Sequence, residues 1–309
     1  MDSSVTLPLR CLLKELTVFE RPTLREPCLV FAFAGWPDAG EAASGAVRYL
    51  INKLGARKFA ELDPEGFYDF TVMRPLILST ASGQREVRWP SVEFFYARSG
   101  DTNQDLVFFL AIEPSFRWRT FTSAVLGLAQ SCGANTVVGL GALLDNVPHT
   151  REPRVTGGAN RPDLQARLSE TAVATSEYQG PTGIHSAIYN GCQQRGMGYA
   201  TFWGHAPYYI RSVANPKVSL ALLRRLCTFL GLPLDLAELE QEAEAFDLRL
   251  KEALLHNPEL VSLVQRLEEQ EEPPSPPSQV TPEPFPGADA VVEELEEFLR
   301  RRPQPEEGA

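Results

Sequence analysis

Three short segments of the chain combine charged, aromatic and histidine side chains in ways that could support chemistry. They are Gly35–Gly40, Glu113–Arg119 and Asp145–Arg151. Each follows an apolar run typical of a buried strand, the third within a long loop after its strand. His149 in the third segment is the best candidate for a general acid or base, because imidazole titrates near neutral pH. Loops that follow parallel strands meet at the carboxyl edge of a sheet, so we expect the three segments to lie on one rim. A small anionic or nucleoside-like ligand could bind there.

Each segment also has a purely structural interpretation, and the sequence leaves both interpretations open. Asp38 could cap the helix that follows it, because its carboxylate can accept hydrogen bonds from helix amides. Arg117 and Arg119 could form an anion-binding or partner-binding surface, or ordinary ion pairs beside a packed tryptophan. His149 could simply satisfy backbone groups of its own loop.

The remaining charged and histidine side chains are weaker candidates. Arg151 could form an ion pair with Asp145 or Glu113 instead of binding a ligand. His205 lies in a short aromatic segment and is a second, weaker acid or base candidate. His185 lies inside a predicted helix, so we expect it to be structural.

Recognised catalytic signatures are absent from the sequence, which narrows the classes of function. There is no G-x-S-x-G nucleophile elbow, Walker A loop or H-E-x-x-H helix. The five cysteines show no C-x-x-C spacing, so neither a zinc knuckle nor a disulfide framework is predicted. We therefore expect reduced thiols, no metal and no cofactor.

The elements that must position these segments alternate between strands and helices. Buried strands are predicted at Cys28–Ala34, Leu106–Ile112, Thr136–Leu140 and Tyr199–Trp203, with shorter strands at Leu76–Leu78 and Val92–Tyr96. Helices are predicted at about 38–54, 116–132, 164–174, 184–195 and 216–230. Glycine, proline and asparagine predict a long loop over Gly141–Gly158. The alternation is typical of an α/β fold with a parallel sheet.

The C-terminal part of the chain differs in composition from the rest. From Glu268 onward there are twelve acidic and three basic residues, so this part carries −9 of the net charge of −11. The segment 271–287 contains seven prolines and too few apolar side chains to fold alone. We predict an α/β sandwich core at 1–232 and a helical extension at 233–270. An acidic, Pro-rich linker would follow at 271–287, and a docking helix and tail at 288–309.

Length and charge exclude several broad classes of protein. The 309 residues, 43% hydrophobic and 22% charged, are typical of a folded globular chain. The net charge of −11 has the wrong sign for binding nucleic acid through phosphates or for binding an anionic membrane surface. No apolar stretch reaches the ~18 residues of a membrane span. We expect a cytoplasmic protein.

Six motifs stand out along the chain: FAGWPDAGEAASGA, EPSFRWR, LGALLDNVPHTR, YQGPTGI, WGHAPYYI and NPKVSLALLRRL. In their sequence and order, the chain resembles the proteasome assembly chaperone 2 family from about Leu29 to Leu230. The later EELEEFLRRR is similar to the C-terminal segment of longer bacterial members. The resemblance implies a three-layer α/β/α sandwich like that of purine nucleoside phosphorylases. It also implies a protein-binding role, since relatives in eukaryotes and archaea bind proteasome α-subunits and promote ring assembly.

Three functional hypotheses follow from the sequence. The first is a non-catalytic, homo-oligomeric, assembly-chaperone-like protein with proteasome subunits or another protein as partner. The second is an enzyme or sensor that binds a small anionic or nucleoside-like ligand in a phosphorylase-like cleft. The third makes the acidic tail the functional part. Under the first two hypotheses the candidate ligand or interface residues are Trp36, Asp38, Glu113, Arg117, Trp118, Arg119, His149, Thr150, Arg151, Tyr178 and Thr182.

Overall fold

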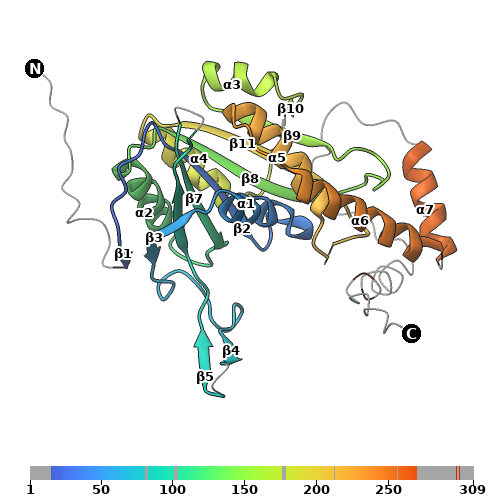
Figure 1. Cartoon of the computed structure of the whole chain (residues 1–309), viewed down its shortest axis with the longest axis horizontal. Helices are drawn as coiled ribbons and strands as arrows, with labels where there is room; N and C mark the ends of the chain where they lie inside the picture. The colour runs from blue at the N-terminus through green and yellow to red at the C-terminus, as the bar shows by residue number, and fades with distance from the viewer. Residues whose placement is uncertain are drawn as a thin grey trace, which may run out of the picture.

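The computed structural model describes residues 15–80, 83–100, 104–175, 179–211, 213–255 and 257–269, together with Glu297 and Leu299. Within these residues, nine strands form one mixed sheet in the order β1-β3-β6-β7-β2-β8-β11-β9-β10 (Figure 1). Its strands are β1 (Leu16–Val18), β2 (Cys28–Ala34), β3 (Arg57–Leu62), β6 (Glu93–Ala97), β7 (Leu106–Ile112), β8 (Thr136–Asp145), β9 (Val155–Ala159), β10 (Ala174–Thr175) and β11 (Gly198–Pro207). The helices are α1 (Ala42–Lys53), α2 (Trp118–Ser131), α3 (Pro162–Ser169), α4 (Ile184–Gln194), α5 (Pro216–Leu230), α6 (Ala237–Leu255) and α7 (Pro258–Glu269).

The four central strands β7, β2, β8 and β11 run parallel, and all four were predicted. β2 and β7 have the predicted bounds, whereas β8 and β11 continue further at their carboxyl ends. Their side chains are mostly buried because both faces of this part of the sheet are covered. Since parallel strands end at one edge, the segments that follow β2, β7 and β8 share a rim, as expected.

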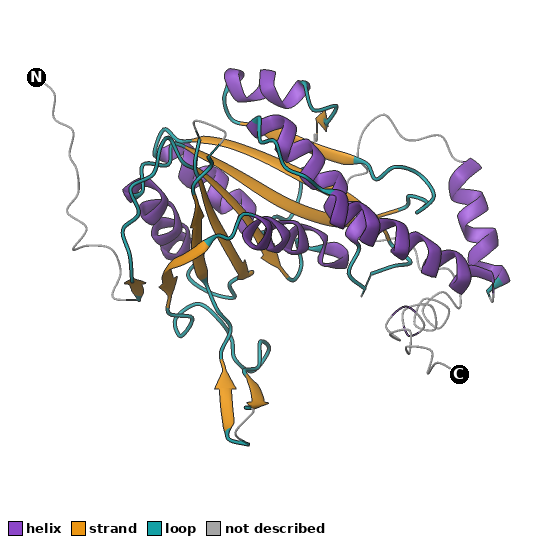
Figure 2. Cartoon of the chain, viewed as in Figure 1, coloured by secondary structure: helices purple, strands orange, loops and turns teal. Residues whose placement is uncertain are grey.

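Helices pack on both faces of the sheet (Figure 2). One apolar core lies between the sheet and α1, α3 and α5, and the other lies between the sheet and α2 and α4. α6 packs on α5, and α7 on α6, so the C-terminal helices extend the molecule away from the sheet. The predicted α/β architecture with a C-terminal helical extension is confirmed.

The prediction of a continuous loop over Gly141–Gly158 is wrong. β8 runs on to Asp145, and β9 begins at Val155, so only residues 146–154 connect them. Glycines made this stretch look irregular, but here they permit close packing within the sheet. A Cβ at Gly141 would lie 2.6 Å from the Trp203 ring, and one at Gly157 would lie 2.3 Å from the Thr201 carbonyl oxygen.

A separate hairpin, β4 (Leu76–Ser79) and β5 (Arg85–Arg88), projects from the sheet on the side of β3 and β6 (Figure 1). Only β4 and the neighbouring β6 were predicted there, because the charged β5 lacks an apolar pattern. Every strand residue of the hairpin is exposed. It therefore takes no part in either core of the sheet.

The C-terminal helices have a small apolar core of their own. Tyr209 and Ile210, at the end of β11, pack there against Phe246 of α6 and against side chains of α7. Leu299 joins this cluster. The predicted linker 271–287 lies outside the described residues. Within the described residues, no helix is long and apolar enough to cross a membrane.

Candidate functional site

Asp38, on the turn after β2, caps α1. Its Oδ1 accepts hydrogen bonds from the backbone amides of Ala43, at 2.8 Å, and Ser44, at 3.1 Å. Burial raises the pKa of Asp38, and the hydrogen bonds from Ser44 and Ala43 oppose that rise. The structural interpretation of Asp38 fits this geometry, because its carboxylate occupies the helix amides that could otherwise bind an anion.

Glu113, on the turn after β7, has a similar role at a different helix. Its Oε1 accepts a 2.8 Å hydrogen bond from the backbone amide of Ile184, at the start of α4. The Trp36 ring lies against Gly183 at the same helix start, and Thr182 bonds to Ser186 one turn further on. Three candidate residues, Trp36, Glu113 and Thr182, are thus brought together. Tyr178 lies outside the described residues.

Arg117 and Trp118 hold the start of α2 in place. Arg117 forms a 3.1 Å ion pair with Glu15 and lies over the Phe67 ring, 5.1 Å from its centre. Trp118 donates a 2.6 Å hydrogen bond from Nε1 to the carbonyl of Pro114. Arg119 is exposed. These contacts fit the interpretation of ion pairs around a packed tryptophan better than that of an anion site.

His149 is buried and hydrogen-bonded, which is a poor setting for an acid or base that must meet a substrate. Its backbone amide donates to the Tyr209 hydroxyl at 2.8 Å, and its Nδ1 lies 2.8 Å from the same oxygen. The Tyr209 hydroxyl is then free to donate to Nδ1, which places the proton of a neutral ring on Nε2. Burial lowers the pKa of His149 to about 4, so the ring is neutral at pH 7.

Thr150 and Arg151 fasten the C-terminal extension to the rim. The Thr150 hydroxyl donates to Oε1 of Glu268, and the Arg151 guanidinium donates to the Glu268 carbonyl. Lys217, at the start of α5, bridges the His149 carbonyl at 2.6 Å and Asp247 of α6 at 2.8 Å. The candidate residues of the third segment therefore contact α5 and α7 directly, and α6 through Lys217. None of the contacts described for them is shared with Asp38, Glu113 or Arg117.

A buried polar chain lies next to this contact, and sequence reasoning underrated it. His205 on β11 places its Nδ1 2.7 Å from Oδ2 of Asp145 on β8, and its Nε2 3.0 Å from the Thr156 hydroxyl on β9. Each residue is less than a tenth exposed. Although burial raises the pKa of Asp145, the hydrogen bond and charge of His205 outweigh it, and the pKa is lowered overall.

This carboxylate–imidazole–hydroxyl order is the one found in catalytic triads. Thr156, however, is 2% exposed, so no substrate reaches its hydroxyl in this conformation. These hydrogen bonds connect the three neighbouring strands β8, β11 and β9 near the carboxyl ends of β8 and β11. The sequence signal that was missed is weak: uncharged residues flank His205 from Trp203 to Pro207, which is compatible with a strand that continues through it.

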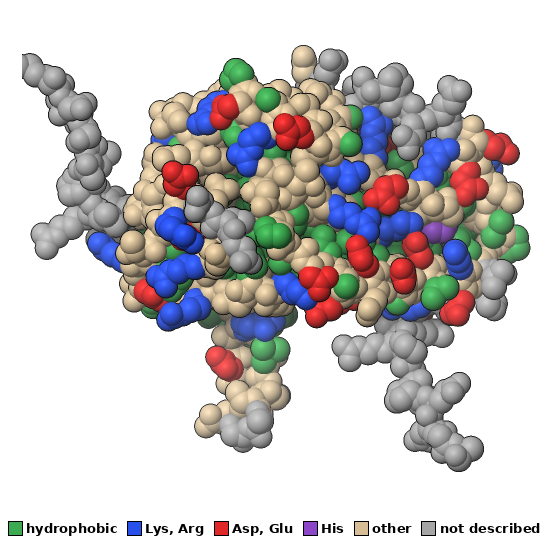
Figure 3. Space-filling view, turned by 45° about the horizontal axis from the view of Figure 1, so that its top comes forward, with side chains coloured by type: hydrophobic (Ala, Val, Ile, Leu, Met, Phe, Trp, Pro, Cys, Tyr) green, Lys and Arg blue, Asp and Glu red, His purple; other side chains and the backbone are tan. Residues whose placement is uncertain are grey.

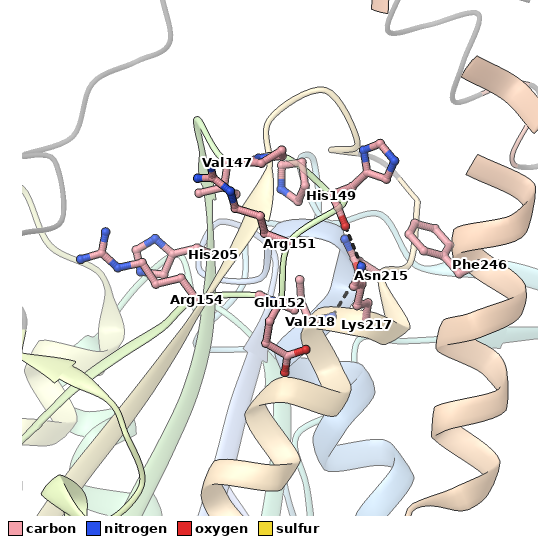
Figure 4. Close-up of a pocket in the computed structure, with 13 residues that line it drawn as sticks. Val147, His149, Arg151, Glu152, Arg154, His205, Asn215, Lys217, Val218 and Phe246 are labelled. Atoms are coloured by element: carbon pink, nitrogen blue, oxygen red, sulfur yellow. Dashed lines mark hydrogen bonds between the residues drawn. The ribbon is translucent and has the colours of Figure 1, made fainter. Parts of the chain in front are cut away.

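A small pocket opens beside His205, between residues 147–154, the start of α5 and the middle of α6 (Figure 4). Arg154 and His205 lie on one side of it, and Lys217 and Phe246 on the other. The space open to the centre of a water molecule is about 20 Å³, which is enough for one or two waters and too little for a nucleoside. Among the described residues, no group of three or more His, Cys, Asp or Glu side chains could hold a metal ion.

Comparisons with known proteins give one consistent result. The model of the PAC2 family matches residues 32–254, which include most of the sheet and the whole rim. No curated protein sequence matches the chain.

Two proteins of known structure are more than one third identical to this chain in sequence. A PAC2 family protein from Streptomyces avermitilis is 38% identical, with a TM-score of 0.70. The Mycobacterium tuberculosis proteasome-assembly chaperone homologue Rv2125 is 36% identical, with a TM-score of 0.69. Each alignment covers 77% of this chain and 100% of the other.

A more distant structure shows that the fold is shared more widely. PbaB from Pyrococcus furiosus, described as an archaeal proteasome activator, is 23% identical with a TM-score of 0.63. That alignment covers 78% of this chain and 99% of PbaB. At this identity, the likeness concerns the fold alone.

Proposed function

The chain belongs to the PAC2 family, and we propose that it is a protein-binding, proteasome-assembly-chaperone-like protein that is homo-oligomeric and non-catalytic. Similarity to a relative that is itself described as a proteasome-assembly chaperone homologue supports the role. So does the fact that this similarity spans the relative's entire length.

The observation that carries the proposal is the exposure of two aromatic rings on the rim. Trp36 is 62% exposed and Phe116 is 51% exposed, on turns that leave the neighbouring strands β2 and β7. Both turns are held by hydrogen bonds, so the rings are presented from a rigid base. Exposed aromatic side chains on rigid turns are typical of the anchors of protein–protein interfaces.

The titratable groups of the rim support a binding role over a catalytic one. Asp38 and Glu113 accept from the amides at two helix starts, and His149 is buried against Tyr209. A general acid or base must reach the proton that it transfers, within about 3 Å or through one water. These side chains are instead committed to contacts that hold the fold.

Binding to purified proteasome α-subunits tests the proposal. We expect the wild-type chain to bind them in a biolayer interferometry assay and to speed the assembly of α-subunit rings. The double variant W36A/F116A should bind at least ~10-fold more weakly, which is the loss of about 1.4 kcal/mol. Phe19 is equally exposed on the far side of β3, so F19A is the matched control and should change the Kd less than about twofold.

Two results would overturn this proposal. One is the absence of any binding or effect on ring assembly by the wild-type chain. The other is equal binding by W36A/F116A and the wild type, which would place the interface elsewhere.

A second candidate function is an enzyme or sensor with a small anionic or nucleoside-like ligand in a phosphorylase-like cleft. The favouring observation is the polar chain of Asp145, His205 and Thr156 beside a pocket that carries Arg154 and Lys217. The pocket would have to widen to admit a ligand of this size. Thermal unfolding with inorganic phosphate or inosine tests this: a rise in Tm that R154Q abolishes supports it, and no rise at millimolar ligand contradicts it.

A further inference from the structure

The β4–β5 hairpin is the part of the described structure that most needs a partner. It stands clear of the body of the protein (Figure 1), and all of its strand residues are exposed. A two-stranded hairpin alone is at best marginally stable in water. Something should therefore pack against it in the functional protein.

The exposed side chains of the hairpin are strongly apolar. Ile77 is 65% exposed and lies opposite Val87 in the register, so the two share one face, with Trp89 two residues further along. Leu76 and Leu78 are exposed on the other face. Apolar groups on both faces of a projecting arm are typical of an element that inserts into a binding surface.

The hairpin is also basic. Between residues 70 and 90 there are three arginines, Arg74, Arg85 and Arg88, and one acidic residue, Glu86. Among the described residues, none of these arginines has an acidic side chain within ion-pair distance. Two hairpins meeting face to face would repel each other through these charges. The partner surface should be acidic with an apolar centre.

The α6 helix of the same chain has that character. It carries six acidic and two basic residues. On the face of the molecule drawn in Figure 3, acidic and basic side chains are interspersed. Glu242 and Glu244 are exposed, and no described Lys or Arg lies within ion-pair distance of either. Leu248, one turn beyond Glu244, is 61% exposed. Other acids of α6 are already paired within the chain, namely Glu238 with Lys53, Glu240 with Arg224 and Asp247 with Lys217.

We propose that the β4–β5 hairpin of one copy binds the exposed face of α6 in a second copy. Arg85, which shares the Ile77–Val87 face of the hairpin, would face Glu244, which shares the Leu248 face of α6. The apolar side chains Ile77 and Val87 would then cover Leu248. This inference names the contact behind the homo-oligomer of the proposed function and rests on that oligomer. It does not depend on which other protein is bound.

The positions of the two surfaces determine the kind of oligomer. The hairpin projects from the β3–β6 side of the sheet, while α6 lies beyond α5 on another side of the body (Figure 1). Each copy therefore gives its hairpin to one neighbour and its α6 to another. Such heterologous contacts close into a ring when the rotation between copies allows it and otherwise form a filament.

A charge-swap experiment tests the contact. Size-exclusion chromatography with light scattering of the full chain should show an oligomer at micromolar concentration. The hairpin variant R85E and the helix variant E244R should each raise the dissociation constant of self-association at least tenfold. The double variant R85E/E244R exchanges the charges across the contact and should restore the oligomer. Both side chains are exposed, so circular dichroism should show an unchanged fold.

Matched controls separate this contact from general charge effects. R21E makes the same change in net charge as R85E, at an exposed arginine outside both surfaces, and should leave the oligomer intact. I77S/V87S removes apolar area without changing charge and should weaken self-association as well.

The possible failures are distinguishable. A wild-type chain that is monomeric at all concentrations would overturn both the contact and the homo-oligomer of the proposed function. An oligomer that survives R85E, or single variants that the double variant R85E/E244R fails to rescue, would overturn the contact alone. Binding of proteasome α-subunits, measured separately through W36A/F116A, is unaffected by either result.

Discussion

The two halves of the rim use similar side chains in opposite ways. At the ends of β2 and β7, Asp38 and Glu113 turn inward to hold helix starts, and this leaves aromatic rings exposed. At the ends of β8 and β11, Asp145 and His205 are buried and bonded to each other, beneath the loop that contacts the C-terminal helices. Residues that lie on the same rim of a sheet therefore do not necessarily form one functional site. One half presents a surface, and the other holds the extension in place.

The largest expected effect lies in the buried half. His205→Ala would leave the Asp145 carboxylate buried without its partner, which typically costs ~3–5 kcal/mol. Urea unfolding at pH 7 measures this loss in the free energy of unfolding. Glu113→Ala, in the other half, removes a helix-capping carboxylate that is only partly buried, so it should cost ~1 kcal/mol. Equal losses from the two variants would contradict the division of the rim.

Lowering the pH should also destabilise the folded protein through the buried half of the rim. His149 titrates at its ordinary pKa near 6.5 in the unfolded chain but at about 4 in the folded protein, because it is buried. The unfolded state therefore binds the proton first, and stability that is complete above pH 6.5 is lost as the pH falls toward 4. Between pH 6.5 and pH 5 this one group should cost ~2 kcal/mol.

The variant His149→Asn isolates that contribution, since its amide oxygen can still accept from Tyr209. Urea unfolding of both proteins at pH 7 and pH 5 should show a smaller loss of stability for His149→Asn than for the wild type. Burial also lowers the pKa of His185, to about 3, so acid sensitivity should remain in the variant. An identical loss in the two proteins would show that His149 is not neutral and buried.

In the surface half, the cap at α1 should contribute a smaller amount. Asp38→Ala removes the acceptor for the Ala43 and Ser44 amides and should cost ~1–2 kcal/mol. Asp38→Asn retains an oxygen acceptor and removes a charge that burial disfavours, so it should stay closer to wild type. The two variants compared by thermal unfolding separate the hydrogen bonds from the charge. A larger loss for Asp38→Asn than for Asp38→Ala would contradict capping.

The central strands and helices can be predicted well from the sequence, because the patterns that indicate them lie within short segments. Cys28–Ala34 and Leu106–Ile112 are uninterrupted apolar runs bounded by clear breaks, and Pro216–Leu230 begins at a proline and ends before a glycine. The edge strands β1 and β10 lack this signal, because each has a neighbouring strand on one side only and both are very short.

The candidate site is harder to predict, because it depends on contacts between distant segments. The link from Glu113 to Ile184 spans 71 positions, and that from Asp145 to His205 spans 60. The shared rim follows from strand direction alone. Which side chain of each segment points inward depends on strand length, and β8 and β11 both continue beyond their predicted ends. The extension of β11 puts His205 on a strand instead of a loop, and the unpredicted strand β9 does the same for Thr156.

The smallest expected effect on stability belongs to the exposed rings, and it decides what the surface half is for. Trp36 and Phe116 lie mostly in solvent, so W36A/F116A should change the free energy of unfolding by no more than ~0.5 kcal/mol per substitution. An exposed aromatic ring lowers solubility and adds no stability to the fold, so its position on the surface is explained by a partner that covers it. Urea unfolding beside the binding assay makes this separation. A stability loss as large as that of His205→Ala would make these rings part of the fold, and the difference between the two halves of the rim would disappear.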